Sequence, residues 1–203
     1  TNYPNMFFKE ATLLWCFFLF VGPILSQRQD AVFYEKLLGT YAIPGISLAL
    51  IEAGKVQYFS QSGVRANDTK DPIGVNTIFG AASLSKPVFA FAVLQLEKQG
   101  KIDIDKPVYQ YLENADLADD PRYKQITTRM LLSHSSGLPN WRNGALKLLH
   151  DPGSKFQYSG EGYMYLAKVV EQIMRKPINE LMHILVFEPL GMENSSYIWD
   201  IRF

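Results

Sequence analysis

Residues 83–86 read Ser-Leu-Ser-Lys, which places a serine hydroxyl and a primary amine three positions apart. On a helix, side chains three positions apart lie on one face and within reach of each other. A serine hydroxyl is a weak nucleophile at its ordinary pKa, and a neighbouring base activates it. Ser83 and Lys86 therefore predict nucleophilic catalysis. The simpler interpretation makes Ser83 or Ser85 a helix cap and Lys86 a solvated charge.

The segment after this motif is apolar on nearly every side from residue 88 to residue 96, and Gly100 closes it. A helix without a polar face belongs in a protein core. Pro87 is tolerated only in the first turn, where backbone N–H groups have no intrahelical partner. The helix must therefore begin close to Ser83, where the positive end of its dipole favours a developing oxyanion.

A second unusual stretch, residues 152–163, holds a Tyr-Ser pair among glycines directly before an amphipathic pattern. It predicts a tight turn that could project Tyr158 sideways. A phenol titrates near pH 10, and a lysine ammonium beside it favours its anion. Tyr158 could then exchange a proton with Ser83. The alternative is a core tyrosine with a hydrogen-bonded hydroxyl, since the chain has eleven tyrosines.

Residues 132–139 place His134 among serines and suggest a Ser–His hydrolase. Neighbouring Ser and His side chains in one segment cannot generally orient on each other, and no Gly-x-Ser-x-Gly elbow occurs. We therefore expect a helix end followed by a Gly-Pro turn whose polar groups bond locally. His150 and His183 are isolated, and three scattered histidines without cysteine partners predict no metal site.

The composition is that of a globular protein: 203 residues, 47% hydrophobic and 20% charged, with a formal net charge of zero. A neutral chain without a basic run predicts no nucleic-acid partner. The expected partner is a small-molecule or short-peptide substrate. The sequence makes no prediction of the oligomeric state.

The apolar run over residues 13–21 predicts a leader or signal peptide over residues 1–26, followed by a domain over residues 27–203. This predicts a secreted or periplasmic protein. Residues 11–25 are short for a bilayer span, and an uncleaved membrane anchor is the alternative. The only cysteine, Cys16, lies in this leader, so we expect stability to come from packing rather than disulfides.

Strand patterns come first in the remaining chain and helical patterns follow. A two-strand hairpin followed by helices predicts an α+β fold with a largely helical lobe. The expected elements are a helix over 30–41, strands over 45–51 and 56–60, the helix that begins near Ser83, and helices over 106–112, 127–133, 161–174 and 179–186.

Four motifs then occur in a fixed order: residues 83–86, residues 131–139, the Pro-Gly to Tyr-Ser-Gly stretch over 152–160, and Pro-Leu-Gly-Met over 189–192. Together they resemble the serine β-lactamase and penicillin-binding protein superfamily. The similarity extends from about Asp30 onward. It is closest to the class C β-lactamase-like branch, which includes esterases and D-amino-acid peptidases.

The resemblance implies a β-lactamase/transpeptidase-like fold and a role for each motif residue. Ser83 would be the acylated nucleophile, Lys86 the amine that helps to deprotonate it, and Tyr158 the general base and acid. Ser85 and Gly160 would contact the substrate, which would be a β-lactam, a short peptide ending in a D-residue, or a small ester. No metal or organic cofactor is implied.

Two departures from the family pattern alter these expectations. The family's Tyr-x-Asn motif ends here in Gly160, which cannot donate a side-chain hydrogen bond to substrate. No Lys-Thr-Gly or His-Thr-Gly follows, and the loss of one oxyanion-hole donor costs roughly 100- to 1,000-fold in rate. We therefore expect a C-terminally truncated domain that lacks late strands and has impaired activity. A non-catalytic module that binds peptidoglycan peptides or a protein is the alternative, and a membrane-anchored Ser–Lys peptidase of unrelated fold is a third.

Overall fold

The computed structural model describes residues 31–199, which form two compact units that divide between Thr77 and Ile78. The predicted leader over residues 1–26, and with it the alternative anchor over 11–25, lies outside the described residues, so both stay predictions. Within residues 31–199, no helix combines the length and the apolar character that a bilayer crossing requires.

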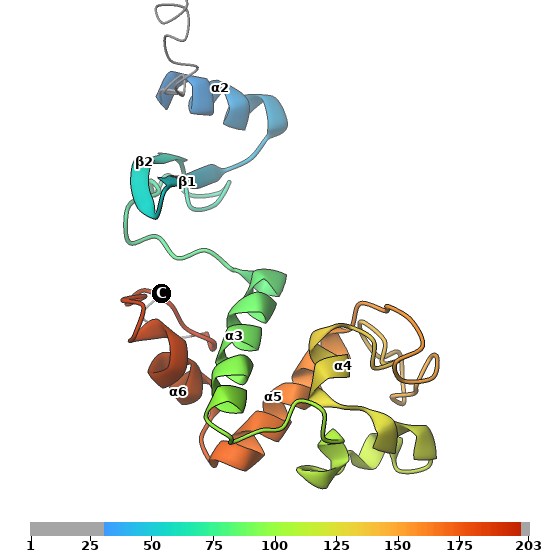
Figure 1. The fold of residues 1–203 in the computed structure, drawn as a ribbon. Helices are drawn as coiled ribbons and strands as arrows, with labels where there is room; N and C mark the ends of the chain where they lie inside the picture. Colours follow the sequence, from blue (N-terminus) through green and yellow to red (C-terminus); the bar gives the residue numbers. More distant parts are fainter. Residues whose placement is uncertain (1–30, 200–203) are drawn as a thin grey trace, which may run out of the picture. The chain divides into compact units, whose positions relative to one another are not determined.

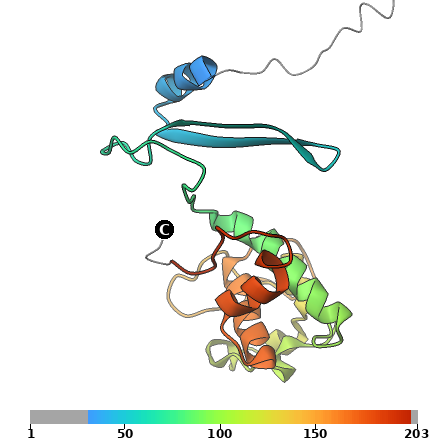
Figure 2. The same cartoon turned by 90° about the vertical axis from the view of Figure 1, so that its left-hand side faces the viewer.

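The first unit contains helix α2 (Ala31–Tyr41) and an antiparallel hairpin of β1 (Gly45–Glu52) and β2 (Lys55–Gly63), drawn as a long ribbon in Figure 2. The turn residues between the strands have φ values of 49° and 73°. Two successive positive φ angles match the twist of hairpin strands. The predicted hairpin is confirmed, and both strands are longer than the sequence indicated.

The two strands pair from Gly45 opposite Gly63 to Glu52 opposite Lys55, with an irregularity between Leu50 and Ile51. Leu38 of α2 is buried, and a Cβ on Gly63 would come within 3.0 Å of the Leu38 side chain. The helix can pack this closely on β2 because Gly63 has no side chain.

The second unit is helical (Figure 1), and it contains the candidate site. Its longest helices are α3 (Ser85–Lys98) and α5 (Gly160–Met174). The shorter elements are η1 (Ala82–Leu84), η2 (Val108–Gln110), η3 (Ala115–Leu117), η4 (Pro121–Gln125), α4 (Thr128–Leu132), α6 (Ile178–Met182) and the π-helical turn η5 (His183–Phe187).

Buried faces of α3 and α5 form the centre of the core of this unit. On α5 the buried side chains include Tyr165, Leu166, Val169 and Val170, a spacing that lines one face of a helix. On α3 only one side is buried, whereas Phe91 and Leu94 are 45% and 48% exposed. The prediction that this helix is buried on all sides is therefore wrong, because its neighbours cover one face.

Two predicted helices differ in the structure. The helix expected over 106–112 is only the short turn η2, because Val108 N donates to Ile126 O at 2.8 Å and Pro107 forms an isolated β-bridge with Thr127. These long-range contacts hold Pro107 in an extended conformation.

The helix expected over 179–186 is α-helical only as far as Met182 and continues as the π-helical turn η5. There the Leu185 carbonyl accepts a hydrogen bond from Gln95 Nε2 of α3 at 2.7 Å. A side chain that enters the backbone ladder is a common cause of such irregular turns.

Candidate active site

Ser83 and Lys86 lie where the short turn η1 passes into α3. Lys86 Nζ donates a hydrogen bond to Ser83 Oγ at 3.2 Å. The residue in the N-cap position of α3 is Leu84, and no side chain caps this end, so the interpretation of Ser83 or Ser85 as a helix cap is wrong. Pro87 is the third residue of α3, within the first turn as expected.

The residue before Ser83 has a strained backbone. Ala82 has a φ angle of 44°, in the left-handed region that costs an L-residue about 1–2 kcal/mol. Strained backbone at such a position is held in place by the surrounding structure and is frequent at functional sites. Here it brings the chain into the turn that presents the Ser83 hydroxyl.

Tyr158 reaches the same place from a different part of the chain. The ring centroid of Tyr158 lies 5.0 Å from Lys86 Nζ. The pKa of Tyr158 is lowered from its usual 10.0, first by a hydrogen bond with Lys86 and next by one with Ser83. The structure therefore brings together the serine, the lysine and the tyrosine that the sequence singled out.

The next residue along the chain fixes Tyr158 at the start of α5. Ser159 is buried and is the N-cap of this helix, where its Oγ accepts a hydrogen bond from Gly162 N at 2.8 Å. The same hydroxyl donates to Pro139 O at 2.8 Å. These bonds tie the turn before α5 to the segment that follows α4.

His134 is a member of this cluster that the sequence interpretation missed. Its ring lies against those of Tyr158 and Tyr163, with centroid distances of 4.4 Å and 5.1 Å. His134 Nδ1 accepts a hydrogen bond from Ser159 N at 3.1 Å, and its carbonyl accepts one from Gln157 N at 2.6 Å. The expectation that this segment bonds only locally is therefore wrong.

Burial lowers the pKa of His134 below 6.5, and the positive charge of Lys86 adds to the effect. The imidazole is consequently neutral at pH 7, which keeps the lone pair on Nδ1 free to accept the Ser159 N–H. His134 itself has a φ angle of 56°. A non-glycine residue in this conformation indicates that the surrounding contacts determine its position.

Gly160, the other predicted substrate contact beside Ser85, is packed too closely to carry a side chain. A Cβ at this position would lie 2.6 Å from Asn140 O and 3.0 Å from the ring of Trp141. Gly160 N donates to Asn140 O at 3.0 Å and to Asn140 Oδ1 at 3.1 Å. The indole of Trp141 thus occupies space into which a longer residue at position 160 would extend.

An ion pair holds the Trp141 segment to α5. The neighbouring Arg142 donates to the buried carboxylate of Glu161 from Nε at 3.0 Å and from Nη2 at 2.8 Å. Its Nη1 reaches Asp116 at 2.6 Å. The hydrogen bonds from Arg142 hold the pKa of the Glu161 carboxyl below its usual 4.5, so the pair stays charged at neutral pH.

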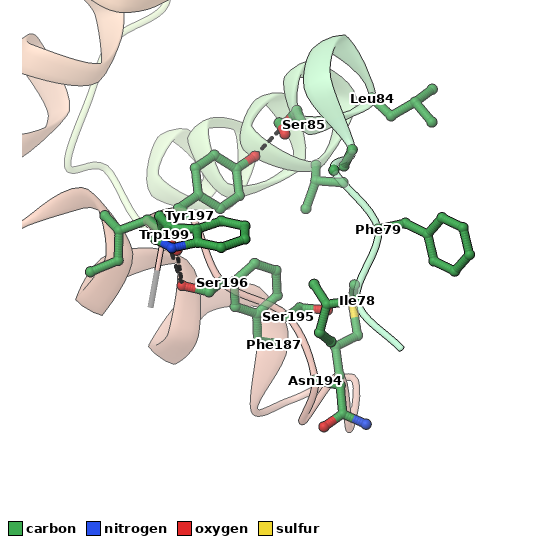
Figure 3. Close-up of a pocket in the computed structure, with 15 residues that line it drawn as sticks. Ile78, Phe79, Leu84, Ser85, Phe187, Asn194, Ser195, Ser196, Tyr197 and Trp199 are labelled. Carbon is green, nitrogen blue, oxygen red and sulfur yellow. Dashed lines mark hydrogen bonds between the residues drawn. The ribbon is translucent and has the colours of Figure 1, made fainter. Parts of the chain in front are cut away.

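Ser85 lies on the wall of a cavity of about 310 Å³ beside the first turn of α3 (Figure 3). Its backbone carbonyl accepts a hydrogen bond from the Tyr197 hydroxyl, which points toward it in the figure. Tyr197 N in turn donates to Asn179 Oδ1 at 2.7 Å. These bonds connect the C-terminal segment to the turn that carries the nucleophile.

Ser85 and Lys86 also line a second cavity, of about 380 Å³, which extends along α5. Both cavities lie wholly in the second unit. Among residues 31–199, no group of three or more His, Cys, Asp and Glu side chains is arranged to hold a metal ion.

The sequence of the chain is similar to that of known proteins. The beta-lactamase family model matches residues 31–202. Esterase EstB from Burkholderia gladioli is 27% identical over 205 residues, which cover 86% of this chain and 52% of the esterase. Penicillin-binding protein 4* from Bacillus subtilis (strain 168) is 28% identical over 200 residues, which cover 87% of this chain and 43% of that protein.

The fold has a counterpart among solved structures. The structure of a class C beta-lactamase matches with a TM-score of 0.73 at 22% sequence identity, over 86% of this chain and 50% of that one. At this level of identity the likeness concerns the fold alone. The chain therefore spans about half the length of the relatives it matches.

Proposed function

The chain belongs to the beta-lactamase family, and on this premise we propose that the protein is a serine hydrolase that forms an acyl-enzyme on Ser83. The single observation that carries the proposal is the convergence at Ser83: Lys86 Nζ lies 3.2 Å from its Oγ and 5.0 Å from the centre of the Tyr158 ring. A hydroxyl with an adjacent base, itself oriented by a third group, is the general arrangement of an activated nucleophile.

In the proposed reaction the Tyr158 phenolate accepts the proton of the Ser83 hydroxyl, while the Lys86 ammonium stabilises the phenolate. Ser83 Oγ attacks the substrate carbonyl carbon, and the C–O or C–N bond to the leaving group breaks. The leaving group takes the proton back from Tyr158. Water then attacks the acyl-enzyme by the same route and releases the carboxylic acid and free Ser83.

We propose carboxylic esters as the main substrate class. The name of the similar EstB, an esterase, supports this choice. Gly160 supports it as well. A glycine has no side-chain amide that could bind an amide-bearing substrate, and the Trp141 indole occupies the space into which a longer side chain would extend. β-Lactams and D-amino-acid peptides would be alternative substrates that undergo the same reaction more slowly.

The test is covalent labelling of the full-length polypeptide with an alkyl fluorophosphonate. Ser83 Oγ attacks phosphorus, fluoride leaves, and the adduct mass locates the modified residue. We expect the label on Ser83 in the wild type and none in Ser83→Ala. A matched control is Ser154→Ala, which removes a hydroxyl at an exposed position outside both cavity linings and keeps Ser83. Labelling that persists in Ser83→Ala would overturn the proposal.

The alternative function is a non-catalytic binding module on the same fold, and the glycine at position 160 is the observation that favours it. Titration calorimetry with peptidoglycan peptides distinguishes the two. Saturable binding that Ser83→Ala leaves unchanged, in a protein that the fluorophosphonate does not label, would favour the module over the enzyme.

A further inference from the structure

The second cavity follows one stripe of α5. Its lining includes Gly160, Tyr163, Met164, Ala167, Lys168 and Glu171. These positions recur at intervals of three and four, so they form a continuous stripe along a single helix face. At 1.5 Å per residue the stripe is roughly 16 Å long.

One end of this stripe adjoins the proposed nucleophile. Gly160 directly follows the Tyr158 and Ser159 pair, and Lys86, which bonds to Ser83, is part of the same lining. The other end is polar, because Lys168 and Glu171 lie there. The cavity therefore leads from Lys86, the hydrogen-bond partner of Ser83, along the helix to a charged end.

The walls between these ends are apolar. Opposite the stripe stand Phe89 of α3 and Ile178 of α6, and Trp141 lies beside Gly160. Phe89 packs edge-on against Tyr163 of the stripe with ring centroids 6.3 Å apart. Met164 is 55% exposed, although the opposite face of α5 is fully packed in the core.

We propose that this cavity is the acyl-chain subsite of the enzyme and that it selects esters of linear, medium-length fatty acids. The inference rests on the proposed function and specifies its substrate. An acyl group on Ser83 is continuous with the cavity through Lys86, so a straight chain can lie along the α5 stripe. A volume of about 380 Å³ is within the usual range for small-molecule sites, and its apolar walls match a hydrocarbon chain.

The size of the effect follows from burial. Each methylene that leaves water for an apolar site gains enough free energy to raise a rate constant by up to about fourfold. We expect acylation to accelerate as the chain grows and to level off once the chain reaches the Lys168 and Glu171 end.

The experiment measures the pre-steady-state burst of p-nitrophenol from p-nitrophenyl acetate, butyrate, hexanoate and octanoate with the full-length polypeptide. The burst reports acylation of Ser83, so slow hydrolysis of the acyl-enzyme does not hide it. In the wild type the acylation constant for octanoate should exceed that for acetate at least about tenfold. In Ser83→Ala the burst should vanish for every ester.

Two variants place new groups in the cavity. Ala167→Leu fills it, and Met164→Glu introduces a charge at an exposed position of the stripe. Each should lower the octanoate-to-acetate ratio at least about tenfold, since several methylenes lose their apolar surroundings. Ala118→Leu and Leu94→Glu introduce the same two side chains at exposed positions outside the cavity lining and should keep the wild-type ratio.

The outcomes separate the two proposals. A burst that depends on Ser83 but has the same rate for all four esters, or a ratio that neither cavity variant lowers, would overturn the subsite and leave the hydrolase standing. A burst that survives in Ser83→Ala, or the lack of any p-nitrophenol release above background from all four esters in the wild type, would overturn the esterase proposal and the subsite with it.

Discussion

At the residue scale the chemistry depends on the charge state of Tyr158. A phenol that bonds to a lysine ammonium and a serine hydroxyl loses its proton more readily, which is why the pKa of Tyr158 falls below 10.0. The neutral ring of His134 lies against the same phenol and accepts the N–H of Ser159. Lys86 of α3 thus stabilises the Tyr158 phenolate electrostatically, and His134 of the segment after α4 holds the Tyr158 ring in position.

The electrostatic partner can be tested with Lys86→Met, which keeps the length of the side chain and removes its charge. Without the ammonium the pKa of Tyr158 rises toward 10.0. The limb of the pH profile along which Ser83 labelling increases as Tyr158 loses its proton should therefore move to higher pH. The rate at pH 7 should fall about 100-fold or more, as for the loss of a general acid–base partner. Lys98→Met, at the far end of α3, is the control. An unmoved limb in Lys86→Met would contradict this role.

His134 is expected to act as a positioning residue for Tyr158. Below pH 6.5 the imidazole gains a proton as pH passes its lowered pKa, Nδ1 can no longer accept the Ser159 N–H, and labelling should fall. His134→Asn supplies an acceptor and tolerates a positive φ, so it should retain labelling at neutral pH and lose this acidic limb.

His134→Phe keeps a ring but has no acceptor, and it should label slowly at every pH although the protein stays folded by circular dichroism. An acidic limb that persists unchanged in His134→Asn would exclude the role. Equal rates for the Asn and Phe variants would exclude it as well.

Sequence reasoning found some of these residues and missed others for a physical reason. Ser83 and Lys86 are visible because their contact is local to one helix turn. Tyr158 was singled out by its glycine-rich turn, and its meeting with Lys86 could not be derived from spacing. His134 was missed because its bond to Ser159 N spans 25 residues of sequence.

At the element scale the turn before α3 stores strain that a single substitution can release. Ala82 has a φ of 44°, whereas the neighbouring Ala81 has a φ of −74° in the right-handed region. The left-handed conformation costs an L-residue about 1–2 kcal/mol, and glycine avoids this cost. The greater freedom of glycine in the unfolded chain offsets about 0.5–1 kcal/mol of the gain.

Ala82→Gly should therefore raise the free energy of unfolding by up to about 1.5 kcal/mol in urea titrations. Ala81→Gly is the matched control and should lower it by about 0.5–1 kcal/mol, because only the entropic cost of glycine applies there. Destabilisation by both substitutions would show that the turn is not strained at Ala82.

Predictions of helices and strands were correct where a local sequence pattern determines the conformation. They were wrong where contacts between distant parts of the sequence determine it. The hairpin and the helix after Gly160 follow from alternation and helical periodicity. Residues 106–112 carry a helix-like pattern, but Pro107 pairs with Thr127 and Val108 bonds to Ile126, so the segment forms only the short turn η2. No local pattern contains that pairing.

At the scale of the whole molecule, the family could be identified because the order of several weak motifs carries more information than any one of them. The loop from residue 133 to residue 159 shows what this order leaves out. Asn140 and Arg142, inside this loop, bond to Gly160 and Glu161 at the start of α5, and these partners become clear only in three dimensions. The candidate site thus depends on the second unit as a whole, and its core sets the stability of the site.

The core of this unit can be tested at Leu166, whose side chain is fully buried on the face of α5 opposite the proposed subsite. Leu166→Ala should lower the free energy of unfolding by about 2–5 kcal/mol, the cost of lost apolar contacts plus a cavity. Leu190→Ala removes the same atoms at a side chain that is 59% exposed and should change it by less than about 0.5 kcal/mol. Urea titration measures both, and Ser83 labelling at a temperature where each variant is folded should match the wild type. Equal destabilisation by the two variants would mean that α5 does not bury Leu166 in solution.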